Sequence, residues 1–379
     1  MAATAIRAIR AIRAIRAIRV IGPIGPIGPV GAAHPDGAPR SASRQVRPCP
    51  RRLRGLRYLG LLLMPAVAAA QSVPPATWPQ RPVVLVVSSA PGAGVDFFAR
   101  ILADQLPARI GQPVVVENRP GASGMIAAAQ VARAAPDGHV LFLMPNTLVM
   151  ARHGLAAQAS TVDVMSELAP IVMPVTTTMV LAVNAKFAQS GPVGSVDDLV
   201  ALVRRMPGLP YASGVNGSPM HFLGEQFKRA TATDLTHVPY KGVAQAVAAA
   251  IGGQVNVIWM PTSGNVQYFR AGSLRALATS SPARSPLRPE VPTMREAGYP
   301  AIEAVAWYGL LAPAEVPAGT VDRINTVVNA VLSVPLVRER LLAAGYLPEG
   351  GPPVRLARQM RSDDVQYQRL ARELDIRSD

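Results

Sequence analysis

The chain has 379 residues, 38 Lys+Arg against 23 Asp+Glu, a formal net charge of +15, one cysteine and 49% hydrophobic residues. This composition excludes disorder along the whole chain, and a single cysteine excludes a disulfide framework. The charge suggests a nucleic-acid partner, but residues 1–70 carry +11 of it, from twelve arginines and one acid. The remaining 309 residues hold 26 basic and 22 acidic groups, so we expect no nucleic acid to bind the folded protein.

Residues 1–45 have the composition of a low-complexity leader. Ala-Ile-Arg occurs five times in 5–19, and Ile-Gly-Pro occurs three times in 21–29. A period of three spreads the isoleucines around a helix, and Gly and Pro in every triplet prevent regular structure. We hypothesise that translation starts further downstream, for example at Val46 if its codon is GTG.

Residues 46–70 have the parts of a secretory signal peptide. Four arginines in 51–57 precede the apolar run 58–70 (YLGLLLMPAVAAA), which ends in three alanines. Thirteen residues are too few for a membrane span, which needs about 20. We therefore expect cleavage after Ala70, which removes Cys49, and a mature protein in the periplasm.

From Trp78 onward, apolar β-branched runs alternate with helical patterns. Strands are expected at 83–87, 114–116 and 140–144. A helix follows the turn at 91–94, and a second helix follows the loop at 118–124. Strand and helix alternating at this spacing predict parallel strands with helices on both faces of a sheet.

The alternation resumes after a less regular stretch at 151–180. Ser195 begins a helix to Arg205 with a capping-box pattern, and Ser218 and Pro219 begin a helix through Arg229. Further strands are expected at 210–212, 237–240, 255–259 and 274–278, helices at 243–251 and 261–269, and a mostly helical carboxyl end from 317, including 332–344 and 355–376. A length of 309 residues favours two domains over one core.

Three glycine-rich turns stand at expected starts of helices: 91–96 (PGAGVD), 118–124 (NRPGASG) and 213–218 (SGVNGS). Unpaired N–H groups at a helix start attract anions. No Lys-Ser/Thr pair follows these turns, and 91–96 lacks the third glycine of a dinucleotide fingerprint. Each turn alone is typical of a tight connection, whereas three together favour a small carboxylate ligand.

Catalytic and metal-binding patterns are absent from the sequence after residue 70. Its four histidines form no H-E-x-x-H motif, no G-x-S-x-G elbow occurs, and no set of residues has metal-ligand spacing. We expect no enzyme activity, no cofactor and no metal. His221, in the first turn after Ser218, either faces a ligand or packs in the protein. Trp259 alternates with Val255 and Val257, which favours core packing.

Several motifs resemble one family along nearly all of 78–379, in the family's order: the periplasmic solute-binding proteins of tripartite tricarboxylate transporters, or Bug-type receptors. The motifs are WPQRPVVLVV at 78–87, PGAGVDFFAR at 91–100, GQPVVVENRPGASG at 111–124, ARAAPDGHVLFL at 132–143, VPYKG at 238–242, GGQVNVIW at 252–259, AGSLRALATSSPAR at 271–284, VPTMREAGYP at 291–300 and WYGLLAPAEVP at 307–317.

The resemblance implies an α/β, two-lobed periplasmic binding protein of type II, a Venus flytrap in which each lobe is a sheet flanked by helices. Lobe 1 would comprise 78–180 plus 301–379, and lobe 2 would comprise 181–300. The implied function is a monomeric, non-enzymatic receptor that captures a mono- or dicarboxylic acid for membrane permease subunits. Two alternatives stay open: an adaptor that presents its ligand to a membrane sensor protein, and an α/β enzyme that binds a phosphate cofactor.

The resemblance also implies a set of ligand-binding residues. They are Ala90, Pro91, Gly92, Gly94, Val95, Asp96, Asn146, Thr147, Ser213, Asn216, Ser218, His221, Tyr240, Lys241 and Trp259. Asp96 either meets the ligand or only favours the helix start, with Arg100 four residues on.

Three positions depart from the family pattern. Ala93 and Val95 replace a glycine and a hydroxyl residue in the first loop, and Asn256 replaces an aspartate. If position 256 faces the ligand, the missing charge disfavours an amino acid and favours a plain carboxylate.

Overall fold

The computed structural model describes residues 78–154, 162–374 and 376, all within the unit Gln71–Asp379. The predicted leader, signal peptide, cleavage site and Cys49 lie outside the described residues. Within the described part, every helix is too short or too polar to cross a membrane.

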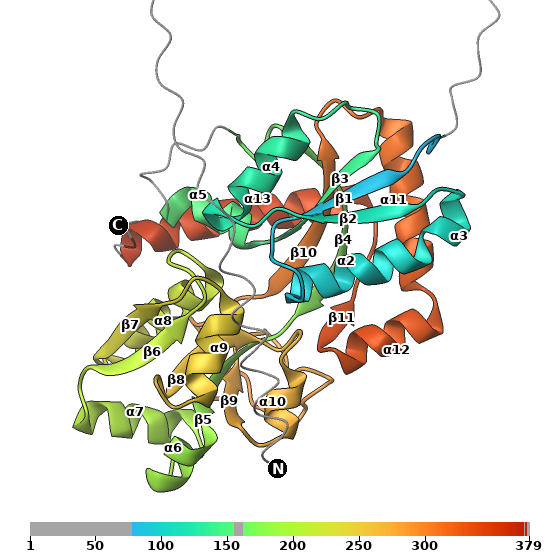
Figure 1. Ribbon diagram of the computed structural model, residues 1–379. Coiled ribbons are helices and arrows are strands. Elements are labelled where there is room, and N and C mark those ends of the chain that lie inside the picture. Colours follow the sequence, from blue (N-terminus) through green and yellow to red (C-terminus); the bar gives the residue numbers. More distant parts are fainter. Residues whose placement is uncertain (1–77, 155–161, 375, 377–379) are drawn as a thin grey trace, which may run out of the picture. The chain divides into compact units, whose positions relative to one another are not determined.

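Six strands form a first sheet in the order β11-β4-β10-β3-β1-β2 (Figure 1). Strand β1 pairs in parallel with β2 and with β3, which confirms the pairing predicted from the alternating pattern. Strands β10 and β11 pair antiparallel to their neighbours, so the sheet is mixed. The bounds are β1 Val83–Val87, β2 Val114–Asn118, β3 Val140–Pro145, β4 Leu168–Thr177, β10 Ala306–Pro313 and β11 Tyr346–Pro348.

Five strands form a second sheet in the order β7-β6-β8-β5-β9. Strand β6 pairs in parallel with β7 and β8, whereas β5 pairs antiparallel with β8 and β9. The bounds are β5 Met179–Asn184, β6 Leu209–Ser213, β7 Leu235–Pro239, β8 Val257–Pro261 and β9 Leu274–Thr279.

Helices surround both sheets (Figure 1). The helices around the first sheet are α2 Gly94–Gln105, α3 Pro107–Ile110, the short η2 Ala122–Gly124, α4 Met125–Ala132, α5 Thr147–Gly154, α11 Ala318–Leu332, α12 Pro335–Ala343 and α13 Pro353–Glu373. The helices around the second sheet are α6 Ala185–Ser190, α7 Val196–Arg205, α8 Pro219–Thr231, α9 Val243–Ile251 and α10 Val266–Arg270. Each sheet has its own apolar core: one cluster serves the second sheet, and two cover opposite faces of the first.

The chain passes twice between the sheets. Strand β4 ends at Thr177 and β5 begins at Met179, so Thr178 alone makes the first passage, and the segment between β9 and β10 makes the second. The first sheet therefore contains strands from both ends of the described chain, which is an α/β fold with two lobes.

Local start signals in the sequence are confirmed. Ser195 and Asp198 form a capping box at α7, because each side chain accepts a hydrogen bond from the other residue's main chain. Ser218 caps α8, with Pro219 as the first helical residue. The helix expected at 243–251 is α9.

Two expectations about elements were wrong, and strand β10 was not predicted. The stretch 151–180 contains the ten-residue strand β4, whose Ala169, Pro170 and Pro174 obscured its apolar pattern. Strand β10 overlaps the motif at 307–317, for which no element was expected from the sequence. The helix expected at 261–269 begins only at Val266, because residues 262–264 form a turn bonded to the other lobe.

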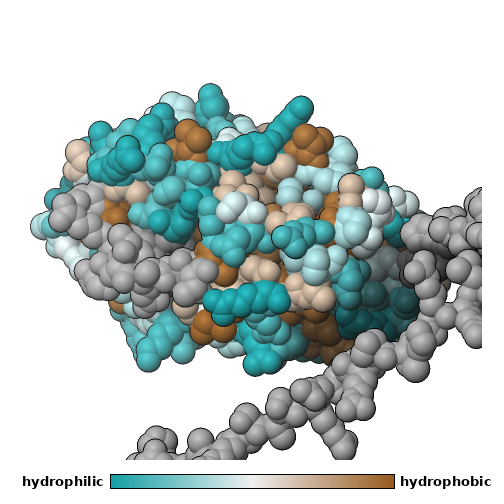
Figure 2. All heavy atoms as spheres, turned by 90° about the horizontal axis from the view of Figure 1, so that it is seen from above, coloured by the Kyte–Doolittle hydropathy of each residue, from teal (hydrophilic) through white to brown (hydrophobic). Residues whose placement is uncertain are grey.

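The face shown in Figure 2 intersperses hydrophilic and hydrophobic residues, with no single band of one kind. This mosaic agrees with the near balance of charge after residue 70.

Candidate ligand site

The predicted ligand loops follow the carboxyl ends of parallel strands. Residues 91–96 follow β1, Asn146 follows β3, the 213–218 loop follows β6, and Tyr240 follows β7. In each sheet, parallel strands bring these ends to one edge, which is where open α/β sheets bind ligands. The fold therefore groups the predicted residues into two sets, one on each lobe.

Asp96 organises the first loop. Its carboxylate accepts hydrogen bonds from Gly92 N–H at 2.8 Å, from Arg100 Nε at 2.9 Å and from Asn118 Nδ2 at 2.9 Å. The side chain is only 2% exposed. Of its two open interpretations, the structure favours an internal role, in which Asp96 folds the loop back against the first turn of α2.

Burial alone would raise the pKa of Asp96, but the three donors outweigh it and hold that pKa below its usual range. Asp96 is therefore charged at neutral pH, and its partners balance the charge. The first N–H groups of α2 have no hydrogen-bond partner within the helix, so they can still attract an anion.

Gly94 lies where a side chain fits only if its neighbours shift. A Cβ atom there would lie 2.8 Å from Tyr308 Oη and 3.0 Å from Tyr346 Oη. Tyr346 Oη donates a hydrogen bond of 2.7 Å to Gly94 O. Ser263 belongs to the second lobe, and its Oγ would lie 3.7 Å from the same Cβ. Hydroxyl groups from three distant parts of the chain thus surround the start of α2.

A polar junction joins the two lobes next to this loop. Ser263 N–H donates to Thr177 Oγ1 at 3.0 Å, and Thr262 Oγ1 donates to Gly345 O at 3.1 Å. Gly264 N–H donates to Ala344 O at 3.0 Å. These bonds fix residues 262–264 of the second lobe beside β4 and β11 of the first.

Asn146 has an internal role like that of Asp96. Its Nδ2 donates to Val305 O at 3.1 Å, and its N–H donates to Trp307 O at 3.0 Å. Nearby, the buried carboxylate of Asp363 accepts from Trp307 Nε1 at 2.8 Å. Burial raises the pKa of Asp363 despite its hydrogen bonds. These contacts fix the turn after β3 and leave Thr147, half-buried, as the more accessible residue.

The second-lobe residues fall into accessible and buried sets. Asn216 and Tyr240 are half-buried and Lys241 is exposed. Ser213, Ser218 and His221 are buried. Ser218 caps α8, accepting from His221 N–H at 3.4 Å, so its hydroxyl already serves the helix.

Two apolar side chains of the predicted set lie in the cores. Trp259 is 1% exposed within the core of the second sheet, and Val95 lies in a core of the first sheet. We assign both side chains to packing, so only the main chain of Val95 is available to a ligand.

The position of Asn256 does not support the expectation that its missing charge favours a plain carboxylate over an amino acid. It immediately precedes β8, so it lies at the opposite end of that strand from the 262–264 turn, about 20 Å away along the strand. Its carbonyl oxygen accepts from Asn184 N–H at 2.9 Å. The missing charge at 256 therefore does not discriminate between amino acids and other carboxylates at the predicted site.

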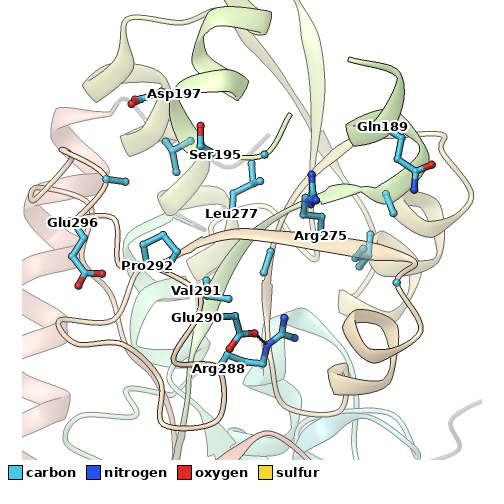
Figure 3. A pocket seen from close by; sticks show the side chains of 17 residues that line it. Gln189, Ser195, Asp197, Arg275, Leu277, Arg288, Glu290, Val291, Pro292 and Glu296 are labelled. Carbon is cyan, nitrogen blue, oxygen red and sulfur yellow. Dashed lines mark hydrogen bonds and ion pairs between the residues drawn. The ribbon is translucent and has the colours of Figure 1, made fainter. Parts of the chain in front are cut away.

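A cavity of about 580 Å³ lies elsewhere on the second lobe, along edge strand β9 (Figure 3). Its lining includes Arg275, Arg288, Glu290 and Asp197, and it contains none of the predicted ligand residues. Arg288 and Glu290 form an ion pair, and Arg275 Nη1 donates to Val193 O at 3.3 Å. Both arginines and Glu290 are thus engaged with the protein itself.

Sequence reasoning missed several residues that surround the first-lobe loops. Asn118 was recognised only as part of a glycine-rich turn, although its place at the end of a parallel strand was a usable signal. Tyr308, Tyr346, Ser263 and Asp363 carried no local signal, because they reach the loops only through the folded chain.

The α/β fold with two lobes is that of the periplasmic binding proteins. A solved structure described as a periplasmic transporter is 33% identical, covers 80% of this chain and all of that chain, and superposes with a TM-score of 0.74. The sequence model of TctC, the tripartite tricarboxylate transporter family receptor, matches residues 98–373. The chain belongs to this family.

Individual relatives agree along most of the chain. Protein BugT of Bordetella pertussis is 34% identical over 315 residues, which are 83% of this chain and 94% of BugT. An R. palustris protein solved with adipate is 30% identical, with a TM-score of 0.73 over 79% of this chain and 98% of that chain. MatC from Rhodopseudomonas palustris, with bound malate, is 30% identical, with a TM-score of 0.69 over 77% and 99%.

Proposed function

We propose that this protein is a periplasmic receptor that captures a small mono- or dicarboxylic acid between its two lobes. The observation that carries the proposal is the 91–96 loop, which Asp96 folds around the start of α2 while Tyr346 fixes Gly94. First-turn N–H groups of a 12-residue helix suit one carboxylate of a ligand. Two relatives with bound dicarboxylates, malate and adipate, support this ligand class.

The second lobe supplies the groups that would close on the rest of the ligand. In the proposal these are Asn216, Tyr240 and Lys241, which are the more accessible members of the predicted set. The Lys241 ammonium would attract a second carboxylate, and Thr147 would face it from the first lobe. No bond is made or broken, and the closed form is handed to permease subunits of a tripartite tricarboxylate transporter.

The direct test is a thermal-shift screen of the purified protein against malate, adipate and other mono- and dicarboxylates. A ligand present at 100 times its Kd stabilises the folded state by about 2.7 kcal/mol, which raises the melting temperature measurably. We expect at least one carboxylate to do so. If none raises the melting temperature and none co-purifies, the receptor proposal fails for this ligand class.

Delivery to a permease and presentation to a membrane sensor use the same closed form. Deletion of the gene separates them, with uptake of the labelled ligand as the measurement. Loss of uptake supports the transport role, whereas normal uptake with a lost transcriptional response supports the sensor.

A further inference from the structure

Two histidine side chains of the second lobe stack face to face beside the 213–218 loop. The ring centroids of His221 on α8 and His237 on β7 lie 3.8 Å apart, with an interplanar angle of 7°. Tyr211, the partner of His237 in the β6–β7 ladder, extends the stack at 5.1 Å. Because two imidazolium ions at this distance would repel strongly, at most one ring carries a charge.

Each ring of the pair bonds one end of the loop. His237 Nε2 lies 2.7 Å from Ser213 Oγ, at the end of β6. Gly217 N–H donates to His221 Nδ1 at 3.2 Å, one residue before the helix cap. The stack therefore connects the first and the penultimate residues of the loop through a single rigid unit.

The bond from Gly217 fixes the protonation state of His221. Because Nδ1 accepts a hydrogen, it carries none of its own, and the neutral ring holds its proton on Nε2. The ionisable groups described around the pair are Glu225 and Lys228 on α8 and Tyr211 on β6. Tyr211 Oη and Lys228 Nζ both contact the Glu225 carboxylate, at 2.7 and 2.8 Å, while His221 Nε2 is 4.0 Å from it.

The surroundings keep His221 neutral over the ordinary pH range. Burial, with a contribution from the Lys228 charge, lowers the pKa of His221 to about 4. The acceptor for Gly217 N–H is therefore available wherever the protein is folded near neutral pH.

We propose that His221 and His237 are positioning residues that hold the 213–218 loop in the shape that receives the ligand. The inference rests on the proposed function, and it gives His221 a role behind the loop instead of at the ligand. A loop held in place before binding loses less conformational freedom when the ligand arrives, so affinity should depend on the pair. Protonation of His221 Nδ1 would remove the acceptor and place its new N–H next to the N–H of Gly217.

The test compares two substitutions of His221, one that keeps an acceptor without the ring and one that keeps the ring without an acceptor. In His221→Asn the side-chain oxygen can take the place of Nδ1 as an acceptor, but it does not titrate. In His221→Phe the flat ring and the stack remain, but no acceptor does. His139→Phe is the matched control, because His139 is equally buried and accepts from Gln80 N–H at 3.1 Å in the first lobe.

The first measurement is the protection factor of the Gly217 amide in ligand-free protein, by hydrogen exchange and NMR. We expect the wild-type factor to fall on the order of tenfold between about pH 7 and about pH 3.5. His221→Asn should keep the high value throughout, His221→Phe should have the low value throughout, and His139→Phe should follow the wild type. Equal protection in the wild type and His221→Phe overturns the proposal, as does a wild-type factor that does not change with pH. If His221→Phe does not fold, the pH profiles of the wild type and His221→Asn decide alone.

The second measurement is the affinity for malate and for adipate at neutral pH, by calorimetry. We expect His221→Phe to bind on the order of tenfold more weakly than His221→Asn, because the loop must be ordered on binding. Equal affinities would overturn the positioning role while leaving the receptor function intact. If neither acid binds any form but the protection pattern appears, the hold on the loop stands and the proposed ligand class fails.

Discussion

Tyr346 and Gly94 are joined by a hydrogen bond of 2.7 Å from the phenol hydroxyl to the glycine carbonyl oxygen, although 252 residues separate them. The Phe97 ring, one turn into α2, stacks on Tyr346 with centroids 5.9 Å apart. The loop at the start of α2 is therefore shaped by a strand from the other end of the chain. Four consequences of such contacts can be measured.

Substitution of Gly94 by alanine should destabilise the protein and weaken ligand binding. The new Cβ would lie 2.8 Å from Tyr308 Oη, and such overpacking costs about 1–3 kcal/mol. Urea unfolding measures the stability. Adding Tyr308→Phe, which removes the closest atom, should recover part of the loss. Gly319→Ala, in a helix with open space around its Cβ, should be neutral or slightly stabilising, and a similar loss there would contradict the steric explanation.

Asp96→Asn should disturb the first loop. An amide can accept fewer of the three bonds, and its NH₂ group would face donors at Gly92 or Asn118, so we expect a loss of about 1–3 kcal/mol and weaker ligand binding. Asp104→Asn is the control, since Asp104 is exposed on the same helix. Wild-type stability in Asp96→Asn would show that the carboxylate network does not organise the loop.

Gly92→Val should reduce ligand affinity more than its effect on stability explains. Gly92 has φ +81°, with open space around its Cβ, so valine meets backbone strain and also covers the loop. Gly111→Val is the matched control, because Gly111 has φ +71° and equally open space but lies at the other end of α2 and α3. We expect both variants to lose similar stability, about 1–2 kcal/mol, and only Gly92→Val to lose affinity. Equal affinities in the two would remove the loop from the site.

Because of His221, the free energy of unfolding should decrease as the pH is lowered from about 6.5, the ordinary pKa of histidine, to about 4. Its pKa of about 4 in the folded state lies below the unfolded value, so the unfolded chain binds the proton first. The contribution is present above pH 6.5, decreases as the pH falls through this window and levels off below 4, with an upper bound of about 3 kcal/mol. Thermal unfolding of the wild type and His221→Asn at several pH values measures it, and parallel profiles would assign the pH dependence to other groups.

The amino-acid sequence by itself determined what depends on neighbouring residues. The alternation from Val83 onward indicated parallel strands with crossing helices, and Ser195 and Ser218 marked helix starts through bonds within their own first turns. The family motifs gave the class of protein and the loops to consider. The helix starts depend on residues that are neighbours in the chain, and the motifs can be read directly from the sequence. Neither needs the three-dimensional structure.

The tertiary structure decided which side chains of those loops are buried within the protein. Asp96, Asn146 and His221 looked alike as polar residues at helix starts, and each is buried and bonded within the protein. Their partners at Asn118, Val305 and Gly217, with Tyr346 at Gly94, depend on strand order, which brings distant residues to one edge of a sheet. The sequence alone showed that most of the +15 charge lies in residues 1–70. The partner of each buried polar group could be found only from the fold.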